Sequence, residues 1–400
     1  MDDEERILLF ALSSISGVGA HLWQEIIKKI GSAKEVYSST KGDLRGIISN
    51  EKIISAILEK EGVEDAEKLF LDHKKKGVKV VSYFDDDYPA RLRNINKPPC
   101  FLFILGENNL NSRRVVSVIG TRYPSSYGRE NTTKFLEGLS EYGVLVMSGL
   151  AYGIDVIAHK HALKYGMKTA AIIAGGVDRI YPAEHKPIAE EMIKNGGCIV
   201  SESPLGTEPE KYLFPARNRI IAGCSDAVLI IEAGHKSGTI ITAICANDFN
   251  REVFAVPGDV NRSTSIGCNN LIKKNQAQLV TSYEDIVLMM NWKDKIEHKT
   301  KEREKVLGRE IENCGESEGD GKKKSSEPLS DIYASLNDKE KAIFDVLSCG
   351  GSLFFDEIVS KTHMSTQELS FLLLNMEFKD IIINLPGNKY KVKDMKRQLM

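Results

Sequence analysis

Short apolar runs that alternate with glycine-rich turns and helical patterns between residues 117 and 258 constrain the fold of this chain most strongly. Runs such as Ala227-Val228-Leu229-Ile230-Ile231 are apolar at every position, which is typical of strands buried on both faces. Their regular alternation with helices predicts a doubly wound, mostly parallel sheet. The expected fold class is therefore α/β, and its turns meet at one edge of the sheet.

The same pattern predicts the positions of individual elements. Strands are expected over 114–119, 144–147, 168–173, 198–201, 226–232, 252–256 and 278–280. Helices are expected over 128–142, 154–165, 184–194, 215–223, 238–249 and 266–274. Two earlier β-rich runs, over 78–83 and 101–105, are predicted to be edge strands that lead into the sheet.

The chain before the sheet has helical periodicity over 6–72, which predicts a helical domain over 1–75 and a sheet domain over 76–290. Within the helical part, Ser16-Gly17-Val18-Gly19 opens a helix in the manner of SAM or helix-hairpin-helix modules, whose backbone amides grip a phosphate. The same four residues also suit a helix C-cap followed by a tight turn. Both interpretations remain open from the sequence.

Beyond the sheet the apolar pattern stops and then returns. The stretch 291–330 is rich in Lys, Glu, Gly and Ser, which predicts a flexible linker. Over 331–400 two capping-box patterns begin at Asn337 and Ser365, and a hairpin pattern follows over 381–392. Short helices closed by a hairpin predict a winged-helix-like domain.

The composition is that of a globular protein and does not indicate which ligand it binds. The 54 Lys and Arg nearly balance the 56 Asp and Glu, giving a net charge of −2 and no global basic excess, although a local basic patch is still allowed. The acidic start lacks the basic region of a signal peptide, and no apolar run approaches the roughly 18 residues of a membrane span. Seven scattered cysteines suit a reducing compartment. We expect a cytoplasmic protein with no membrane contact.

The first two turns of the predicted sheet carry groups suited to an anion. After strand 114–119, Gly120 allows close backbone approach, Thr121 offers a hydroxyl, and Arg122 offers a guanidinium fork for phosphate oxygens. The second turn places Ser148 and Gly149 at a strand end, where ligands of open α/β sheets bind. The nearby Asp155 has the wrong charge for an anion site and is expected to cap helix amides and fix its loop.

Two later turns extend this edge. Pro215 opens a helix, and Arg217, Asn218 and Arg219 crowd its first turn, where cations oppose the helix dipole. Such arginines are expected to hold an anionic ligand, or one of them a nearby Asp or Glu. The fourth turn is formed by Lys236, Ser237, Gly238 and Thr239 at the start of another helix. Four anion-binding turns on one edge favour a polyanion over a small molecule.

Motifs of small-molecule chemistry are missing from the sequence. The first strand is followed by neither a G-x-G-x-x-G nor a G-x-x-x-x-G-K-[ST] pattern, which disfavours a dinucleotide and Walker-type ATP hydrolysis. His159 and His161 are two apart on a helix and point to different faces, which disfavours a shared metal ion. His185 and Cys224 have no evident triad partners. We therefore expect no catalytic residues, no cofactor and no metal.

Several sequence blocks together resemble the DNA-processing protein A family (DprA, also called Smf). The resemblance spans roughly 77–282, with every block in family order. The blocks are Val118-Ile119-Gly120-Thr121-Arg122, Ser148-Gly149-Leu150-Ala151-Tyr152-Gly153-Ile154-Asp155, Gly175-Gly176-Val177-Asp178-Arg179-Ile180-Tyr181-Pro182, Phe214-Pro215-Ala216-Arg217-Asn218-Arg219-Ile220-Ile221-Ala222-Gly223, Ser237-Gly238-Thr239-Ile240-Ile241-Thr242-Ala243 and Arg251-Glu252-Val253-Phe254-Ala255-Val256-Pro257-Gly258.

The resemblance implies an extended Rossmann-like domain that binds single-stranded DNA without marked sequence preference. It also implies a homodimer formed through that domain, protection of incoming DNA, and loading of a RecA-type recombinase during natural transformation. The DNA-binding residues that it implies, together with the charge argument, are Gly120, Thr121, Arg122, Ser148, Gly149, Gly153, Arg217, Asn218, Arg219, Lys236, Ser237 and Gly238. Tyr152 departs from the family, which commonly has Arg there, and offers a stacking surface for a base instead.

Two other functions compete with this interpretation. The fold class also resembles the lysine-decarboxylase-like (LOG) nucleotide phosphoribohydrolases, whose P-G-G-x-G-T-x-x-E motif supplies a catalytic carboxylate. Alignment on Gly238-Thr239 places Thr242 where that acid belongs, which disfavours hydrolysis. Duplex DNA binding through the C-terminal domain is disfavoured because the predicted helix 365–378 carries few basic residues.

Overall fold

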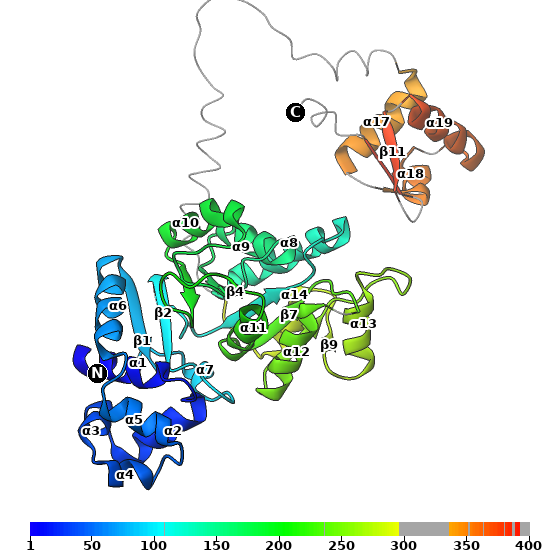
Figure 1. Cartoon of the computed structure of the whole chain (residues 1–400). Helices are drawn as coiled ribbons and strands as arrows, with labels where there is room; N and C mark the ends of the chain where they lie inside the picture. The colour runs from blue at the N-terminus through cyan, green and yellow to red at the C-terminus, as the bar shows by residue number, and fades with distance from the viewer. Residues whose placement is uncertain are drawn as a thin grey trace, which may run out of the picture. The chain divides into compact units, whose positions relative to one another are not determined.

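The computed structural model describes residues 1–107, 109–235, 237–295, 336–350, 353–362, 364–379, 381–385 and 389–392 (Figure 1). The chain divides into two compact units, Met1–Arg303 and Glu304–Met400. Most of the predicted linker over 291–330 lies outside the described residues. Among the described residues, no helix is long and apolar enough to cross a membrane.

A nine-stranded sheet forms the centre of the first unit, with strand order β1-β2-β6-β5-β4-β3-β7-β8-β9. The strands are β1 (Val78–Ser82), β2 (Phe101–Gly106), β3 (Val115–Ile119), β4 (Leu145–Ser148), β5 (Thr169–Ile172), β6 (Cys198–Ser201), β7 (Ala227–Ile230), β8 (Glu252–Ala255) and β9 (Gln278–Leu279). The pairs β1–β2 and β2–β6 are antiparallel, and all other pairs are parallel. The predicted mostly parallel α/β sheet is therefore confirmed.

The strands predicted over 114–280 are all present, each within about two residues of its expected bounds. One detail of the earlier strands was wrong. The first of them, β1, is an edge strand, but β2 is not, because it pairs with β1 on one side and with β6 on the other. The apolar composition of β2 agrees with this inner position, since its first four residues are buried.

Helices cover both faces of the sheet (Figure 1). Those of the first unit are α1 (Asp3–Ser14), α2 (Ala20–Ile30), α3 (Ala33–Ser38), α4 (Lys41–Arg45), α5 (Glu51–Leu58), α6 (Val63–Lys75), α7 (Ala90–Arg93), α8 (Ser126–Leu139), α9 (Ile154–Lys164), α10 (Lys186–Lys194), α11 (Leu213–Gly223), α12 (Gly238–Asp248), α13 (Ile266–Lys273) and α14 (Tyr283–Met289), with short 3-10 turns over Ser140–Tyr142 and Ala183–His185.

Two separate hydrophobic clusters show how the strands present alternate residues to the two helix layers. Val116 and Val118 of β3 pack into the cluster that contains residues of α8, α9 and α14. Val115 and Ile119 of the same strand pack into the opposite cluster, which contains residues of α11, α12 and α13. A central strand buried on both sides requires an apolar residue at nearly every position, as the sequence of β3 shows.

The N-terminal helices share a hydrophobic cluster with the sheet. Phe10 of α1 contacts Phe101 and Phe103 of β2 in edge-to-face geometry, with ring centroids 5.5 and 5.9 Å apart. Arg6 donates a 2.8 Å hydrogen bond to the carboxylate of Asp85, which follows β1. Residues 1–75 therefore pack directly against the antiparallel end of the sheet.

The order of the strands places a crevice at the middle of the sheet. Strand β3 lies between β4 and β7, so the chain leaves β3 toward one side and later returns to pair on its other side. Loops that follow strands on the two sides of such a reversal diverge, and open α/β sheets bind ligands at this point. The loops after β3 and β7 carry two of the four anion-binding turns predicted from the sequence.

The described residues of the second unit form three helices and a three-stranded antiparallel sheet with order β10-β12-β11. Its elements are α17 (Asp338–Gly350), β10 (Leu353–Phe354), α18 (Phe355–Thr362), α19 (Thr366–Phe378), β11 (Ile382–Leu385) and β12 (Lys389–Val392). The predicted helix starts are confirmed, since the side chains of Asn337 and Ser365 accept hydrogen bonds from the backbone of Glu340 and Glu368. The predicted hairpin pairs β11 with β12.

Candidate functional site

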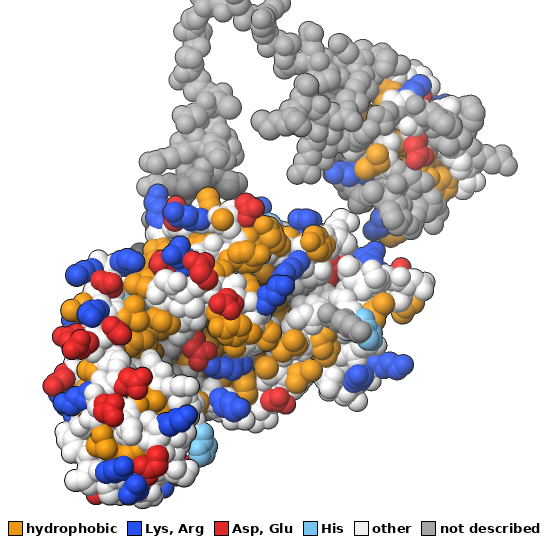
Figure 2. All heavy atoms as spheres, in the orientation of Figure 1, with side chains coloured by type: hydrophobic (Ala, Val, Ile, Leu, Met, Phe, Trp, Pro, Cys, Tyr) orange, Lys and Arg blue, Asp and Glu red, His pale blue; other side chains and the backbone are white. Residues whose placement is uncertain are grey.

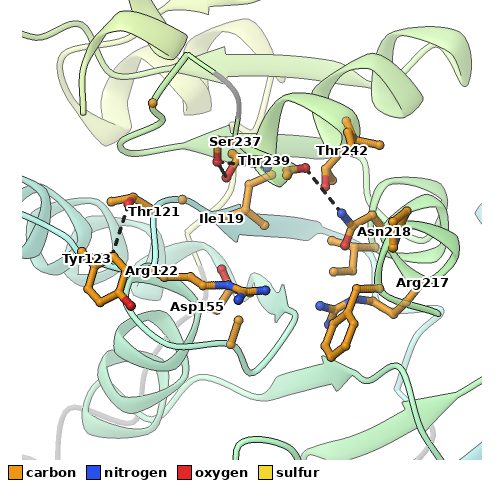
Figure 3. Close-up of a pocket in the computed structure, with 18 of the residues that line it drawn as sticks. Ile119, Thr121, Arg122, Tyr123, Asp155, Arg217, Asn218, Ser237, Thr239 and Thr242 are labelled. Carbon is orange, nitrogen blue, oxygen red and sulfur yellow. Dashed lines mark hydrogen bonds between the residues drawn. The ribbon is translucent and has the colours of Figure 1, made fainter. Parts of the chain in front are cut away.

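A pocket of about 760 Å³ lies where the strand order reverses (Figure 3). Five segments line it: the loop after β3, the loop after β4, the loop after β5, the helix α11 with the residues before it, and the segment that leads from β7 into α12. The lining residues are Ile119, Gly120, Thr121, Arg122, Tyr123, Ala151, Asp155, Tyr181, Lys211, Phe214, Pro215, Arg217, Asn218, Ile221, Gly234, Ser237, Gly238, Thr239, Ile241 and Thr242. The four predicted turns therefore do meet at one edge.

Arg122 reaches into this pocket from the loop after β3 (Figure 3). Its side chain is exposed, and among the described residues no hydrogen bond or ion pair occupies its guanidinium. The loop that carries Arg122 is anchored to the segment after β7. The carboxylate of Glu232 in that segment accepts hydrogen bonds from the backbone N–H and the hydroxyl of Ser125 at 2.9 and 2.6 Å. Arg122 is therefore a free cation on a well-anchored loop.

Arg217 approaches the same pocket from α11 but is buried, with 7% of its surface exposed. Its Nη1 donates hydrogen bonds to the carbonyl oxygens of Gly149, at 2.7 Å, and Ile172. Burial lowers the pKa of Arg217 to about 10, Asp155 opposes this change, and the positive charge of Arg122 adds to it. The two arginines thus repel each other across the pocket.

Asp155 lies beside Arg217 and is also buried. Its carboxylate accepts a 3.1 Å hydrogen bond from the backbone N–H of Gly149. Burial raises the pKa of Asp155, while Arg217 and the Gly149 hydrogen bond act in the opposite direction. The expectation that Asp155 fixes its loop is confirmed, but the expectation that it caps helix amides is wrong. Asp155 lies inside α9, and the N-cap residue of that helix is Gly153, whose φ of +80° favours glycine.

The described residues that line the pocket carry three cations, Arg122, Lys211 and Arg217, and one carboxylate, Asp155. The buried carboxylate compensates the buried Arg217, which leaves the charges of Arg122 and Lys211 uncompensated within the lining. An anion placed between Arg122 and Arg217 would relieve their repulsion. Backbone amides and hydroxyls at the start of α12 add further donors, since Ser237 is its N-cap residue and lines the pocket.

Several predicted residues line the pocket as expected. Gly120, Thr121 and Arg122 come from the first turn, and Asn218, Ser237 and Gly238 from α11 and the last turn. Asn218 donates a 3.4 Å hydrogen bond to the carbonyl of Gly238, which joins α11 to the start of α12 (Figure 3). Lys236, predicted in the same turn, lies outside the described residues.

Other predicted residues lie beneath the surface: the loop after β4 reaches the pocket, but not through Ser148, Gly149 or Gly153. Ser148 is fully buried, and its hydroxyl donates to the carbonyl of Val118 at 2.6 Å. Gly149 and Gly153 are buried under the loop surface, so only Ala151 and Asp155 of this segment line the pocket. These buried positions hold the loop in place but offer no exposed surface.

The arrangement of α11 also differs from expectation. The helix begins at Leu213, two residues earlier than predicted, so Arg217 and Arg219 lie beyond its first turn. Arg219 is not among the residues that line the pocket and pairs with Glu202. The alternative of an arginine paired with an acidic residue therefore holds for Arg219, and in part for the buried Arg217 beside Asp155.

Sequence reasoning missed a group of residues at the rim of the pocket. Tyr123, Tyr181, Lys211 and Phe214 all line it. The three aromatic residues stand next to or inside a predicted motif, and their aromatic character was the one signal in the sequence that could have identified them. Their grouping depends on strand order, because positions 123 and 181 belong to two separate loops and position 214 to the helix α11.

Comparison with known proteins places this fold and pocket in a family. Residues 79–291 match the model of the family described as DNA recombination-mediator protein A. The chain is 30% identical to Protein Smf of Synechocystis sp., over 98% of this chain and all of that protein. It is 35% identical to the DNA processing protein DprA of Bacillus subtilis, over 60% of this chain and 81% of that protein.

A solved structure supports the same assignment. The X-ray structure of DNA processing protein A from Streptococcus pneumoniae aligns with a TM-score of 0.62 and 32% sequence identity. The alignment covers 74% of this chain and 99% of that chain. Since the family match covers more than half of the chain and a relative aligns over 98% of it, the chain belongs to the DNA recombination-mediator protein A family.

Proposed function

We propose that this protein binds single-stranded DNA without marked sequence preference and acts as a recombination mediator that loads a RecA-type recombinase. The single observation that carries the proposal is the pair of arginines at one pocket, Arg122 and Arg217, whose mutual repulsion an anion would relieve. Family membership indicates which anion to expect, because the matching family is described as a DNA recombination mediator.

The proposed binding surface is the pocket at the strand reversal. Arg122 and Lys211 would contact phosphate oxygens directly, because both line the pocket and are exposed. The hydroxyls of Thr121 and Ser237 and the amides that begin α12 would add hydrogen bonds. Gly120, Asn218 and Gly238 line the same pocket, and Lys236, which lies outside the described residues, is proposed from the sequence alone to contact DNA.

The buried members of the predicted set have a different proposed role. Ser148, Gly149, Gly153 and Arg217 position the loop after β4 and the floor of the pocket, and Arg219 fixes α11 through Glu202. These residues would affect the affinity for DNA indirectly, because they determine the shape and the charge of the pocket. Only Arg217 among them lines it.

Several finer expectations complete the proposal. We propose a cytoplasmic homodimer formed through the sheet domain, which protects incoming DNA during natural transformation. Its domains would be a SAM or helix-hairpin-helix-like domain over 1–75, an extended Rossmann-like domain over 76–290, a linker over 291–330 and a winged-helix-like domain over 331–400. The three helices and antiparallel sheet of the second unit support the last of these. The protein would bind DNA rather than hydrolyse nucleotides.

The direct test compares two arginines at opposite ends of one strand. Arg122 follows β3 and lines the pocket, whereas Arg113 precedes β3, is 77% exposed and pairs with Asp294. Binding of a labelled oligo-dT strand is measured by fluorescence anisotropy for Arg122→Ala and for the matched control Arg113→Ala. We expect a loss of affinity on the order of tenfold for Arg122→Ala only, the effect of one charge-assisted phosphate contact. Equal affinities in both variants would refute this assignment of the site.

A further inference from the structure

The loop between β6 and α11, residues 202–212, brings a cation to the pocket. Lys211 lies near the end of this loop, is exposed and lines the pocket. Among the described residues, no hydrogen bond or ion pair holds its ammonium group. The position of this charge is therefore determined by how the backbone of the loop is held, and not by contacts of the side chain.

The N-terminal helices hold this loop through His73. His73 lies in the last turn of α6, and its ring is fully buried and stacked on Phe103 of β2, with centroids 4.5 Å apart. The backbone N–H of Leu205, within the loop, donates a 3.1 Å hydrogen bond to Nε2 of His73. A residue of the N-terminal helices thus fixes the backbone of the loop that carries Lys211.

The two hydrogen bonds of His73 require one tautomer of its ring. Nδ1 lies 2.6 Å from the carbonyl oxygen of Leu69. A carbonyl oxygen only accepts, so Nδ1 carries the proton, and Nε2 keeps the lone pair that accepts from Leu205. Burial lowers the pKa of His73, against the hydrogen bond to Leu69 and the charge of Asp178, so the ring is neutral at pH 7. His73 is therefore an acceptor for the loop and not a cation for a phosphate.

A second contact from the end of α6 reaches the same loop through Asp178, which belongs to the loop after β5. The carboxylate of Asp178 accepts a 3.0 Å hydrogen bond from the N–H of Gly206, the residue after Leu205. The same carboxylate lies 4.0 Å from the ammonium group of Lys76, the C-cap residue of α6. The end of α6 is therefore connected to two neighbouring residues of the loop.

The N-terminal helices themselves present mixed charge. In the view of Figure 2, Lys and Arg side chains on these helices are interspersed with Asp and Glu. Some of these charges are paired, such as Lys34 with Asp2 and Arg45 with Glu51. A surface of mixed sign attracts a polyanion weakly, which favours an indirect contribution of these helices to DNA binding.

We propose that His73 is a positioning residue of the DNA-binding site, which holds the loop over 202–212 so that Lys211 lines the pocket. The inference rests on the proposed function, because Lys211 is a proposed phosphate contact. Removal of the acceptor at His73 leaves the N–H of Leu205 without its partner, and the loop is then held less firmly. His73 acts through Lys211 and does not touch the strand.

The experiment is a double-mutant cycle between His73 and Lys211 in the full-length protein. His73→Leu keeps an apolar side chain against Phe103 but removes the acceptor. Binding of labelled oligo-dT should weaken on the order of fivefold, because loss of one hydrogen bond lowers the fraction of molecules with the loop in place. The same change in a Lys211→Ala protein should cause no further loss.

Two further variants control for the substitution itself. His73→Gln keeps an acceptor for the N–H of Leu205 and should retain most of the affinity. His21→Leu makes the same change at a histidine of α2 whose side chain is 91% exposed, and it should bind as the wild type does. If circular dichroism shows that His73→Leu does not fold, Asp178→Ala, which removes the acceptor for Gly206, takes its place in the cycle with the same expectation.

Hydrogen exchange of the protein without DNA measures the loop directly. In peptides that cover 203–212, exchange should be on the order of fivefold faster in His73→Leu than in the wild type, and unchanged in His21→Leu. If exchange of the loop does not change, or if His73→Leu weakens binding equally with and without Lys211, the positioning role is wrong while single-strand binding stands. If the wild type binds no oligo-dT at low salt, the proposed function fails, and the inference fails with it.

Discussion

Arg217 donates a hydrogen bond from Nη1 to the carbonyl oxygen of Gly149 at 2.7 Å, while the N–H of the same glycine donates to Asp155. One backbone residue thus lies between a buried cation and a buried anion. The loop after β4 is held from both sides, and the floor of the pocket carries a positive charge that is fixed when the protein folds. The first predictions test this arrangement.

Replacement of Gly149 by Ala should destabilise the protein. A β-carbon at this position would lie 2.7 Å from Cζ of Arg217 and 2.7 Å from a carboxylate oxygen of Asp155, closer than atoms can approach without rearrangement. Overpacking of this kind costs about 1–3 kcal/mol, measurable by urea unfolding. Gly238→Ala is the control, because a β-carbon there meets nothing within 4 Å. Equal stabilities of the two variants would contradict the arrangement.

Replacement of Arg217 by Ala should reduce stability, whereas replacement of Arg122 by Ala should not. The first change leaves Asp155 buried without its compensating charge and two carbonyl groups without a donor, at a cost of about 3 kcal/mol. The second removes an exposed side chain, with an effect within about 0.5 kcal/mol. Chemical denaturation measures both. A stable Arg217→Ala protein would show that Asp155 needs no partner.

The salt dependence of the affinity for single-stranded DNA should report how many phosphates the protein contacts. For single strands the slope of log K against log salt is about −0.7 per phosphate contacted. Arg122→Ala and Lys211→Ala should therefore each make the slope less negative by about 0.7, and the double variant by about twice as much. Titrations at four salt concentrations measure this. An unchanged slope for Lys211→Ala would remove that residue from the contact surface.

The protein should lose stability as the pH falls from 7 to 5, in part because of His159. Its Nδ1 bonds to the hydroxyl of Thr169 at 2.7 Å, whereas its Nε2 is buried and has no partner among the described residues. Burial lowers the pKa of His159 to about 3, from an ordinary value of 6.5. Below pH 6.5 the unfolded chain takes up the proton first, so the free energy of unfolding falls.

The expected size of this loss is about 2 kcal/mol between pH 6.5 and pH 5. Asn keeps a donor for Thr169 but does not titrate, so the pH dependence of His159→Asn should be shallower than that of the wild type. The comparison of slopes isolates His159 from His73 and His161, whose pKa values burial also lowers. Parallel pH profiles of the two proteins would show that His159 does not contribute.

A chain that ends at Lys295 should retain single-strand affinity and be more stable than one that ends at Met290. The guanidinium of buried Arg114 lies 5.6 Å from the ring centre of Trp292, and its Nη1 donates to the carbonyl of Asp294 at 2.7 Å. Truncation at Met290 removes this hydrogen bond and the ring contact, so that Nη1 keeps only its bond to the carbonyl of Tyr142, at a cost of about 1–3 kcal/mol by urea unfolding. Weaker DNA binding by the longer fragment would assign a DNA-binding role to the second unit.

The strands of the sheet could be predicted from the sequence because a strand that is buried on both faces appears as a short, continuous apolar run. The apolar runs of β3 to β8 each identified one strand, and the Gly-rich turns between them marked its end. The pairing of β2 between β1 and β6 could not be predicted in this way. Strand order depends on which distant segments of the chain pair with each other. An apolar run does not show whether its strand lies at the edge of the sheet or inside it.

The residues of the candidate site likewise fall into those that the local sequence predicts and those that only the folded chain brings together. Arg122 was predicted correctly as a pocket residue, because its place directly after a strand determines where it lies. Arg217 was predicted at a helix start but lies beyond the first turn of α11, and its partners, Gly149, Ile172 and Asp155, come from other segments of the chain. The rim residues Tyr181 and Lys211 were missed for this reason, since only the folded chain brings them together.

The reversal of strand order at β3 also bears on how the protein folds. The N–H of Val115 bonds to the side chain of Asp226, 111 residues later, and β3 and β7 pair at the same place. Contacts of such long sequence separation form slowly, because the chain loses much entropy in closing the intervening loop. A ribosome-bound chain that has reached only β6 therefore lacks one wall of the pocket. Ligand-binding competence should arise late in synthesis, when β7 enters the sheet.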